Sequence, residues 1–310
     1  MKPILGTMTF GEQVDLPTSG EMLNLFCESG GDEIDTANVY CDGRTETFLG
    51  ELLVERKKPY IASKVHPWND QGLQPDQIQH QLEQTLDRLK VEKIDLLYLH
   101  APDLDTPITE TLKACFELYE KDKFTEFGLS NYASWQVAEI VELCRQHSWM
   151  QPTVYQGMYN ALTRDVEREL MPCLRNYDIR FYAYNPLAGG LLTGKYQSLD
   201  DLPDDGRFGL HESYQQRYWK QDYFEVLQDM QTACHEAGVK PAQAAMSWLL
   251  NHSMLDAERG DGIIIGASRV EQLTENLKSF QQLPLDSSVT EVMDRGWELT
   301  KPNCTQYFRP

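Results

Sequence analysis

The 310-residue sequence predicts a single-domain α/β fold, a closed (β/α)8 (TIM) barrel. Eight short apolar or β-branched runs alternate with longer amphipathic segments from one end to the other. The runs are apolar enough to be covered on both faces, as parallel strands are. No linker rich in Gly, Ser or Pro interrupts residues 1–310, so we expect one domain. An open, doubly wound sheet is the alternative architecture.

The predicted strands follow one another at short intervals. They cover residues 3–7, 33–35, 60–64, 94–100, 124–130, 153–156, 179–184 and 262–266. Turn signals agree with this assignment, because Gly30 and Gly31 precede the second run and Pro59 directly precedes the third.

The segments between the strands have the periodicity of helices that pack on a sheet, most clearly in residues 75–89 and 134–147. Both place apolar side chains at short helical spacings: Ile78, Leu82, Leu86 and Leu89 in the first, and Val137, Ile140, Val141 and Cys144 in the second. Such a stripe is typical of a helix with one face on the core.

Two segments lack a clear period. Residues 197–223 follow the seventh strand and carry four aspartates before the aromatic cluster Tyr214, Tyr218, Trp219 and Tyr223. A loop of this length in a compact domain is usually a lid or a binding loop. The tail, residues 301–310, is also aperiodic, and we expect it to fold back over the barrel mouth.

Composition excludes several classes of partner. The chain has 28 Lys and Arg against 48 Asp and Glu, and its formal net charge of −20 disfavours nucleic acid and anionic membranes. The start has no charged segment followed by an apolar run, and no run of about 18 apolar residues occurs, which predicts a soluble cytoplasmic protein. The seven cysteines are scattered without a CxxC pair, so neither a disulfide framework nor a metal site is expected.

Polar residues stand at the carboxyl ends of the predicted strands, the end at which the chemistry of a parallel barrel lies. Asp35, Lys64 and His100 end the second, third and fourth strands, and Tyr40 follows Asp35 closely. Each residue alone is explained as well by a buried ion pair or by packing. Their joint occurrence at neighbouring strand ends favours catalysis.

These four residues suit proton transfer. A tyrosine pKa of about 10 is too high for ready donation at neutral pH, and the ammonium group of Lys64 is expected to lower it. Asp35 would keep Lys64 charged and oriented, while His100 would hydrogen-bond an incoming carbonyl or join the proton relay. The remaining strand ends suit an aromatic amide such as nicotinamide: Ser130, Asn131, Gln156, Tyr184, Asn185 and Gly266.

Several motifs resemble those of the aldo-keto reductases, in family order over nearly the whole chain. They are IDTA at 34–37 with Tyr40 following, ASK at 62–64, DLLYLH at 95–100, GLSNY at 128–132, PLAGGLLTGK at 186–195, and residues 266–276. Within the family the chain is most similar to the aflatoxin-aldehyde and succinic-semialdehyde reductases, through YQGMYNA at 155–161, RYWK at 217–220 and YFR at 307–309.

The resemblance implies a catalytic tetrad of Asp35, Tyr40, Lys64 and His100, with Tyr40 as the proton donor, and NADPH/NADP+ as the cofactor. The nicotinamide and its carboxamide would be held by Ser130, Asn131, Gln156 and Tyr184, with Asp35 close by. The pyrophosphate would be wrapped by Asn185, Pro186, Leu187, Gly189, Leu191, Gly194 and Lys195.

A helix opening after the last strand offers a further anion site for the cofactor. Its residues are Gly266, Ser268, Arg269, Gln272, Glu275 and Asn276. Arg269, and Arg207 in the long loop, could neutralise a 2′-phosphate, which favours NADPH over NADH. A solvated surface arginine is the alternative for both.

For the substrate we expect a small carbonyl compound. The residues assigned to its site are Met8, Tyr40, Trp68, His100, Tyr214, Arg217, Trp219 and Arg309. Met8, Trp68, Tyr40 and Trp219 would form an apolar mouth, and Arg217 or Arg309 would clamp a carboxylate. The alternative for the residues of the long loop and the tail is that they are exposed surface residues or packing residues and do not contact the substrate.

These inferences predict an NADPH-dependent oxidoreductase that reduces aldehydes and ketones to alcohols, with carboxylated or dicarbonyl aldehydes as substrates. A regulatory subunit that binds NADP(H), resembling channel β-subunits, is the alternative function. An isomerase or lyase on the same barrel is disfavoured, because the sequence lacks recognisable metal ligands or additional phosphate contacts. The narrower resemblance also suggests a homodimer.

Overall fold

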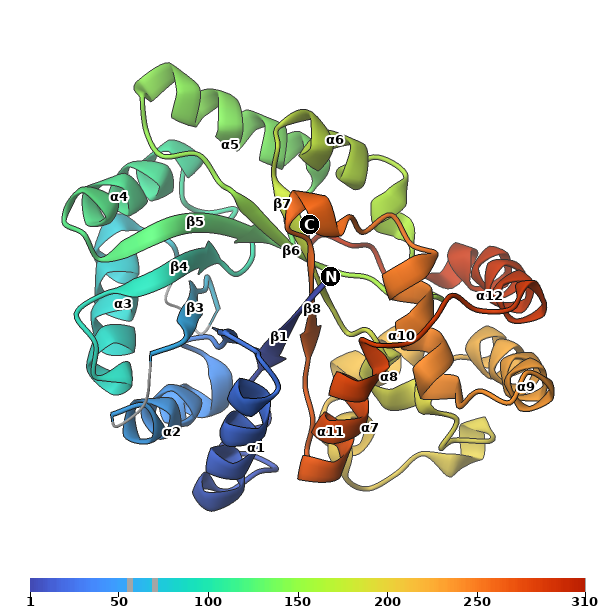
Figure 1. The fold of residues 1–310 in the computed structure, drawn as a ribbon. Helices are drawn as coiled ribbons and strands as arrows, with labels where there is room; N and C mark the ends of the chain where they lie inside the picture. Colours follow the sequence, from blue (N-terminus) through green and yellow to red (C-terminus); the bar gives the residue numbers. More distant parts are fainter. Residues whose placement is uncertain (55–57, 69–71, 310) are drawn as a thin grey trace.

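The chain forms a closed barrel of eight parallel strands, each hydrogen-bonded to the next in chain order, with β8 paired to β1 (Figure 1). The computed structural model describes residues 1–54, 58–68 and 72–309. The strands are β1 Lys2–Gly6, β2 Glu33–Asp35, β3 Tyr60–Val65, β4 Ile94–Leu99, β5 Phe124–Ser130, β6 Val154–Met158, β7 Arg180–Tyr184 and β8 Gly262–Ile265. The closed ring confirms the predicted barrel and excludes the open sheet.

Helices surround the barrel on its outer side (Figure 1). The α-helices are α1 Leu16–Glu28, α2 Arg44–Leu52, α3 Pro75–Leu89, α4 Ile108–Glu120, α5 Ser134–His147, α6 Leu170–Asn176, α7 Gly206–Leu210, α8 Glu212–Tyr218, α9 Gln221–Glu236, α10 Pro241–Asn251, α11 Val270–Ser279 and α12 Ser287–Thr300. Short 3₁₀ turns are η1 Tyr40–Gly43, η2 Asp165–Glu167, η3 Ala188–Thr193, η4 Leu199–Asp201, η5 Ala257–Arg259 and η6 Lys301–Asn303. The bounds of α3 and α5 coincide with the two helices predicted from periodicity.

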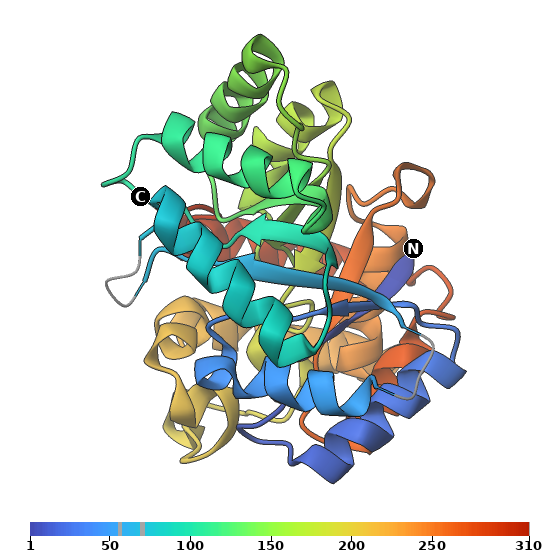
Figure 2. The same ribbon diagram turned by 90° about the vertical axis from the view of Figure 1, so that its left-hand side faces the viewer.

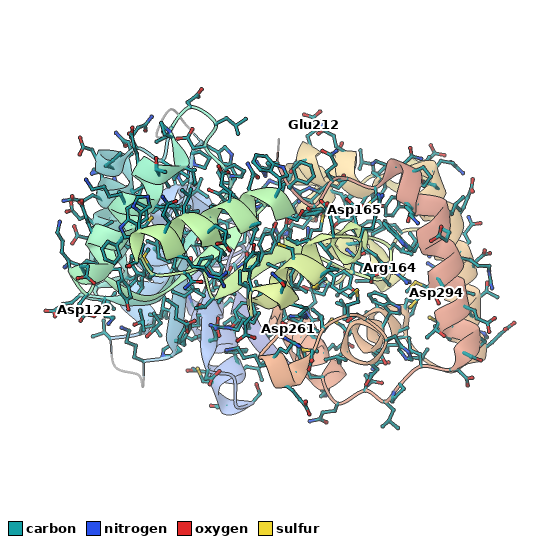
Figure 3. All side chains as sticks on the ribbon, turned by 90° about the horizontal axis from the view of Figure 1, so that it is seen from above. Asp122, Arg164, Asp165, Glu212, Asp261 and Asp294 are labelled. Atoms are coloured by element: carbon teal, nitrogen blue, oxygen red, sulfur yellow. The ribbon has the colours of Figure 1, made fainter. Side chains whose placement is uncertain are left out.

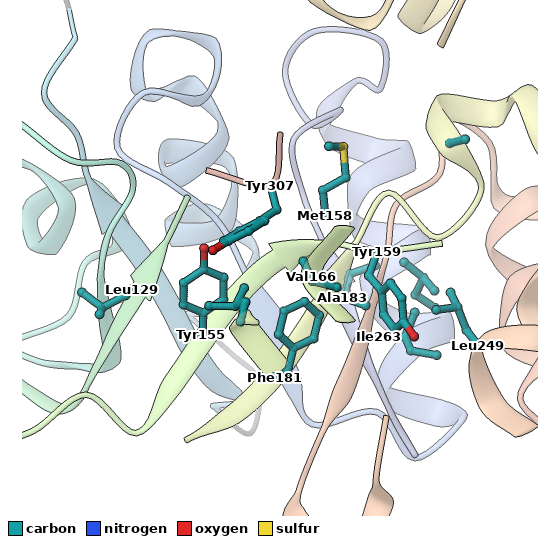
Figure 4. Packing of buried hydrophobic residues seen from close by; sticks show 14 of the residues in the cluster. Leu129, Tyr155, Met158, Tyr159, Val166, Phe181, Ala183, Leu249, Ile263 and Tyr307 are labelled. Carbon is teal, nitrogen blue, oxygen red and sulfur yellow. The ribbon is translucent and has the colours of Figure 1, made fainter. Parts of the chain in front are cut away.

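The strands separate a small inner core from a large outer one, because successive side chains of a strand point to opposite faces. The barrel interior is filled by Ile4, Ala62, Leu96, Tyr98, Val154, Tyr182 and Ile264. The outer core lies between strands and helices, where buried residues such as Phe181 and Ile263 belong to one cluster (Figure 4). Strands covered on both faces account for the nearly continuous apolar runs in the sequence.

Charged and aromatic side chains close the amino-terminal end of the barrel. Lys2 pairs with Glu33, whose carboxylate also accepts a hydrogen bond from the Tyr182 hydroxyl at 3.2 Å. Arg180 pairs with Glu126 at 2.7 Å. This end of a barrel supports stability, whereas the carboxyl end carries the chemistry.

The segment after β7 is more regular than the sequence suggested. It contains η4, α7 and α8, and we call the two α-helices the lid. Its aromatic rings pack on one another: Tyr196, Phe208, Tyr214, Tyr218 and Trp219. Because α7 has five residues and α8 seven, neither is long enough to show a helical period in the sequence.

The C-terminal tail folds back to the barrel mouth, as predicted. The Arg309 backbone N–H donates to the Asn131 carbonyl at 2.9 Å. The buried Tyr307, which lies beside Tyr155 in Figure 4, accepts a hydrogen bond from the Ser134 N–H at 3.0 Å. Figure 2 shows the C-terminus and the gold lid helices toward one side of the molecule and the N-terminus toward the other.

The helix that precedes the tail is held to the body of the barrel by an ion pair. Arg164, in the loop after β6, pairs with Asp294 of α12 at 2.7 Å (Figure 3). The Arg164 guanidinium also lies 4.2 Å from the ring centroid of Trp248. These contacts hold α12, the helix that leads into the tail, against Arg164 and α10.

In the parts of the chain that the structure describes, no helix is both long and apolar enough to cross a membrane. Nor do His, Cys, Asp and Glu side chains of those residues gather in threes as a metal ion would need.

Candidate active site

A buried ion pair forms the centre of the carboxyl end of the barrel. Lys64 Nζ lies 2.6 Å from Asp35 Oδ1, and it also donates to the Thr36 carbonyl at 2.7 Å. The Lys64 side chain is fully buried, so burial lowers its pKa, while the charges of Asp35 and Glu46 oppose that change. The predicted contact between the strand ends of β2 and β3 is therefore present.

The second oxygen of Asp35 has a different partner. Gln156 Nε2, at the end of β6, donates to Asp35 Oδ2 at 2.7 Å. The resemblance to the aldo-keto reductases predicts that Gln156 holds the carboxamide of the cofactor together with Ser130 and Asn131. In the structure its amide nitrogen is already engaged by Asp35.

Tyr40 lies beside this ion pair, in the turn that follows β2. Lys64 Nζ is 5.1 Å from the centroid of the Tyr40 ring, and the His100 ring is 6.0 Å from it. Burial raises the pKa of Tyr40 well above its ordinary value, and the charge of Asp35 raises it further. This is the opposite of the expected lowering by Lys64.

The main reason is burial, which disfavours the charged phenolate. The second is the partner of Lys64 in the folded chain: its ammonium group is in direct contact with the Asp35 carboxylate, whose negative charge acts on Tyr40 in the opposite sense. The cation that lowers the pKa of Tyr40 is instead Arg207, on α7.

His100 stands at the end of β4 with its ring among aromatic neighbours. Trp68 packs edge-on against it, with the ring centroids 4.7 Å apart. Its Nδ1 is buried, and none of the described residues hydrogen-bonds to it. Burial, followed by the charge of Lys64, lowers the pKa of His100 well below its ordinary value, so the imidazole is neutral at neutral pH.

A hydrogen-bonded polar cluster lies next to His100 and consists of Ser130, Asn131 and Tyr184. Asn131 Nδ2 donates to Ser130 Oγ at 2.9 Å and to the His100 carbonyl at 2.8 Å, and Asn131 Oδ1 accepts from the Tyr184 hydroxyl at 2.9 Å. Asn131 has a φ of 63°, a left-handed conformation that Asn tolerates better than most residues. The three residues are together as predicted, with their polar groups bonded to one another.

The glycine-rich segment after β7 has an open backbone at Gly190. Gly189, Gly190 and Gly194 have φ values of 70°, 101° and 78°; a Cβ at Gly190 would meet no described atom within 4 Å apart from its own chain neighbours, whereas Tyr214 and Pro241 fill the spaces beside Gly189 and Gly194. Other residues predicted to bind the pyrophosphate lie along the same turn. They are Asn185, Pro186, Leu187 and Leu191, of which Leu191 is buried in the core. Lys195 is exposed, with its Nζ 5.2 Å from the centroid of the Tyr196 ring.

The loop between β8 and α11 lies at the same mouth. Ser268 donates to Gln272 Oε1 through both its N–H and its Oγ, each at 3.1 Å, and Asn276 Nδ2 donates to the Gly266 carbonyl at 3.3 Å. Gly266 and Arg269 are exposed.

Glu275 differs from the other predicted cofactor residues of this region. It is exposed, and it pairs with Lys240 at 3.2 Å. That partner lies at the start of α10, so the carboxylate belongs to a surface ion pair.

Arg207 reaches from the lid across to the first loop. Its Nη1 contacts Met8 Sδ at 2.8 Å and donates to the Tyr214 hydroxyl at 3.2 Å, and its other nitrogen lies near Gly266. Within the described residues no ion pair joins Arg207 to a carboxylate. A guanidinium group on neutral partners beside an exposed glycine can accept an anion.

A cavity of about 320 Å³ lies between the lid and the tail. It is lined by Asn131, Met158, Tyr184, Ser213, Gln216, Arg217, Thr305, Gln306, Phe308 and Arg309. Of the predicted substrate residues, Arg217 and Arg309 therefore face it, and Arg309 also lies 4.6 Å from the centroid of the Trp68 ring. Tyr214 is buried and is not one of the lining residues; its hydroxyl donates to Asn185 Oδ1 at 3.2 Å.

Trp219 does not belong to the mouth as predicted. Its ring packs on Phe208, Phe224 and Tyr196, and its indole N–H donates to the Leu199 carbonyl at 2.9 Å. The side chain thus stabilises the segment around the lid.

Several lining residues are not among those predicted. Ser213 and Gln216 share one face of α8 with the predicted Arg217, a signal that is readable only once the short helix is known. Met158 ends β6 and Phe308 lies next to a predicted residue, so both positions could have been inferred from their neighbours.

Comparison with known proteins relates this chain to reductases of a single family. The model of the aldo/keto reductase family matches residues 3–298. The chain is 46% identical to aflatoxin B1 aldehyde reductase member 2 of Mus musculus, over 99% of this chain and 87% of that protein. It is 45% identical to aflatoxin B1 aldehyde reductase member 4 of Homo sapiens, over 98% of this chain and 96% of that protein. Identity to aldo-keto reductase family 7 member A3 of Homo sapiens is 45%, with 99% and 96% covered.

Proposed function

Because the chain belongs to the aldo/keto reductase family, we propose that it is an NADPH-dependent reductase in which Tyr40 protonates the carbonyl oxygen of the substrate. Membership makes the chain an oxidoreductase of the kind that reduces aldehydes or ketones. The observation that carries the finer proposal is the buried Lys64–Asp35 pair at 2.6 Å, with Tyr40 and His100 beside it at the carboxyl end of the barrel.

Tyr40 can serve as the acid because it keeps its proton at neutral pH. As negative charge develops on the carbonyl oxygen, the proton moves from the Tyr40 hydroxyl to that oxygen. The phenolate that remains is stabilised by the Lys64 ammonium group, 5.1 Å from the ring centroid. The neutral His100 imidazole donates a hydrogen bond to the same oxygen and orients the carbonyl.

The residues around the barrel mouth fit NADPH, which would supply the hydride for the carbonyl carbon. The open backbone at Gly190 permits close approach of a pyrophosphate, and Arg207 offers a positive charge that neutral groups surround. Exposed Arg269, at the start of α11, offers a second charge near Gly266. Gln156 Oε1, whose amide nitrogen is held by Asp35, would accept from the carboxamide, and Asn131 would orient the carboxamide by exchanging one of its present hydrogen bonds. Tyr184 would stack on the ring.

The cavity between lid and tail supports a carboxylated aldehyde as substrate. Arg217 and Arg309 both line it, and in the described part of the chain neither forms an ion pair with an acidic side chain. Burial, with a smaller contribution from Arg217, lowers the pKa of Arg309 from its ordinary value. Two guanidinium groups that share a cavity favour an anionic ligand, which a carboxylate satisfies with bidentate hydrogen bonds.

A screen of NADPH oxidation, followed by absorbance, tests the proposal. The panel contains carboxylated, aromatic and dicarbonyl aldehydes, with NADH as the control cofactor. We expect oxidation of NADPH, fastest with carboxylated or dicarbonyl substrates. Tight binding of NADPH without turnover of any aldehyde would favour a cofactor-binding regulatory subunit instead.

A further inference from the structure

The turn that carries Tyr40 has a conformation that needs support. Cys41 and Asp42 have φ values of 50° and 53°, and Gly43 has a φ of 83°. Side chains other than glycine rarely adopt such values, and they persist only where the surrounding structure holds them. The position of the Tyr40 hydroxyl therefore depends on contacts outside the turn.

Arg88, in the last turn of α3, makes such contacts on both sides of Tyr40. Its Nη1 donates to the Asn38 carbonyl at 3.3 Å, two residues before Tyr40. Its guanidinium group lies against Gly43, three residues after Tyr40, where a Cβ would fall only 2.2 Å from Arg88 Cζ. One planar group thus spans the turn from end to end.

The groups that hold Arg88 are themselves buried. Its Nη1 also donates to Glu46 Oε2 at 3.3 Å, and Glu46 Oε1 accepts from Ser63 Oγ at 2.7 Å. Glu46 is fully buried, and Ser63 directly precedes Lys64 in β3. The backbone of Arg88 is fixed by α2, because a Cβ at Gly50 would lie 2.0 Å from the Arg88 carbonyl oxygen.

We propose that Arg88 is the positioning residue that fixes the Tyr40 turn for proton transfer, acting with Glu46 from outside the barrel. The proposal rests on the proposed role of Tyr40. Loss of the guanidinium group frees both ends of the turn, and a displacement of about 1 Å from the reacting geometry costs on the order of 100-fold in rate.

The test compares three variants with the wild type. Arg88→Met removes the contacts, and Arg88→Lys keeps the charge but not the planar group. Arg145→Met is the matched control, since Arg145 also lies in the last turn of a barrel helix and pairs with an acid there, Glu142, at 2.9 Å.

Two measurements report on the turn rather than on the amount of folded enzyme. The first is the primary deuterium isotope effect on kcat with NADPH deuterated at the transferred position. The second is hydrogen exchange of the backbone amides of residues 38–46 without cofactor.

We expect Arg88→Met to lower kcat by roughly 10- to 100-fold, to raise the isotope effect and to speed exchange in this segment. Arg88→Lys should lie between Arg88→Met and the wild type. Arg145→Met should match the wild type in both measurements.

An unchanged isotope effect and unchanged exchange in Arg88→Met would overturn the proposal, as would equal changes in Arg145→Met. If Arg88→Met fails to fold because Glu46 is left as an unpaired buried charge, the double variant Arg88→Met/Glu46→Gln replaces it. If the wild type shows no reductase activity, the proposed function fails, and the exchange of residues 38–46 alone decides whether Arg88 holds the turn.

Discussion

Burial sets the protonation states of Tyr40 and His100 more than the nearby lysine does. For both residues burial is the largest cause of the pKa shift, and it favours the neutral form. In the proposed mechanism a neutral Tyr40 holds a proton for the carbonyl oxygen, and a neutral His100 donates a hydrogen bond without taking that proton. In this account Lys64 stabilises the phenolate as it forms.

The pH profile of aldehyde reduction tests these assignments. A proton donor fails as the pH rises through its pKa, and the pKa of Tyr40 is raised well above 10.0. His100 would gain charge only as the pH falls through a pKa well below 6.5. We therefore expect kcat/KM to change by less than about three-fold between pH 6 and 9. A change of kcat/KM with pH near neutrality that is lost in the variant His100→Gln would contradict the assignment of His100 as neutral.

From the sequence it is easier to predict which residues come together at the site than to predict the protonation state of each residue. Asp35, Lys64 and His100 were found from their positions at strand ends, because a parallel barrel brings those ends together. The pKa of Tyr40 was predicted with the wrong sign, because burial is the largest cause of its shift and the charge of Asp35 adds to it. Both depend on packing in three dimensions.

At the scale of elements, the cavity lies between residues at strand ends and two segments, the lid and the tail, in which the sequence shows no clear period. The lid contributes Arg217 from α8, and the tail contributes Arg309. Helices of two turns or fewer show no period, and Trp219 was misassigned for that reason. Its place in an aromatic cluster follows from how the segment folds.

Replacement of either arginine tests the carboxylate clamp. Arg217→Met and Arg309→Met should each raise KM for a carboxylated aldehyde by roughly 10- to 100-fold, the effect of losing a hydrogen bond to a charged group. Steady-state kinetics with a neutral aldehyde of similar length should show little change. Arg168→Met, which removes an exposed arginine of a surface ion pair, is the control. Equal losses on charged and neutral substrates would eliminate the clamp.

At the scale of the whole molecule, the two ends of the barrel differ in role: the amino-terminal end contributes to stability, and the carboxyl end carries the candidate active site. Glu33 lies at the amino-terminal end, fully buried, and burial raises its pKa although Lys2 opposes the change. The folded state then binds this proton more tightly than the unfolded state does. The stability that this proton confers is complete below about pH 4.5 and is lost as the pH rises through the folded pKa.

Glu33→Gln removes this ionisation, so its effect should depend on pH. Between pH 4 and pH 8, the free energy of unfolding of the wild type should fall relative to that of the variant. The change should be on the order of 1 kcal/mol per unit of pKa difference. Denaturant unfolding at the two pH values measures it. Reductase activity should be unchanged, and a selective loss of activity in the folded variant would contradict the separation of the two ends.

The barrel itself could be predicted because its pattern repeats. The sequence has eight apolar runs with amphipathic segments between them. This pattern is typical of a fold in which each strand is buried on both faces. The net charge of −20 disfavours polyanionic partners, but it could not show that Arg207, Arg217 and Arg309 lie around one mouth without acidic partners among the described residues. That arrangement depends on how the lid and tail fold over the barrel.

The most direct test of the account is Tyr40→Phe, which removes one hydroxyl and leaves the ring in place. We expect the variant to lose reduction of aldehydes by at least about 100-fold, the usual contribution of a general acid. Its Kd for NADPH, measured by fluorescence titration, should match that of the wild type. Turnover retained within a few-fold of the wild type, at unchanged cofactor affinity, would contradict the assignment of Tyr40 as the proton donor.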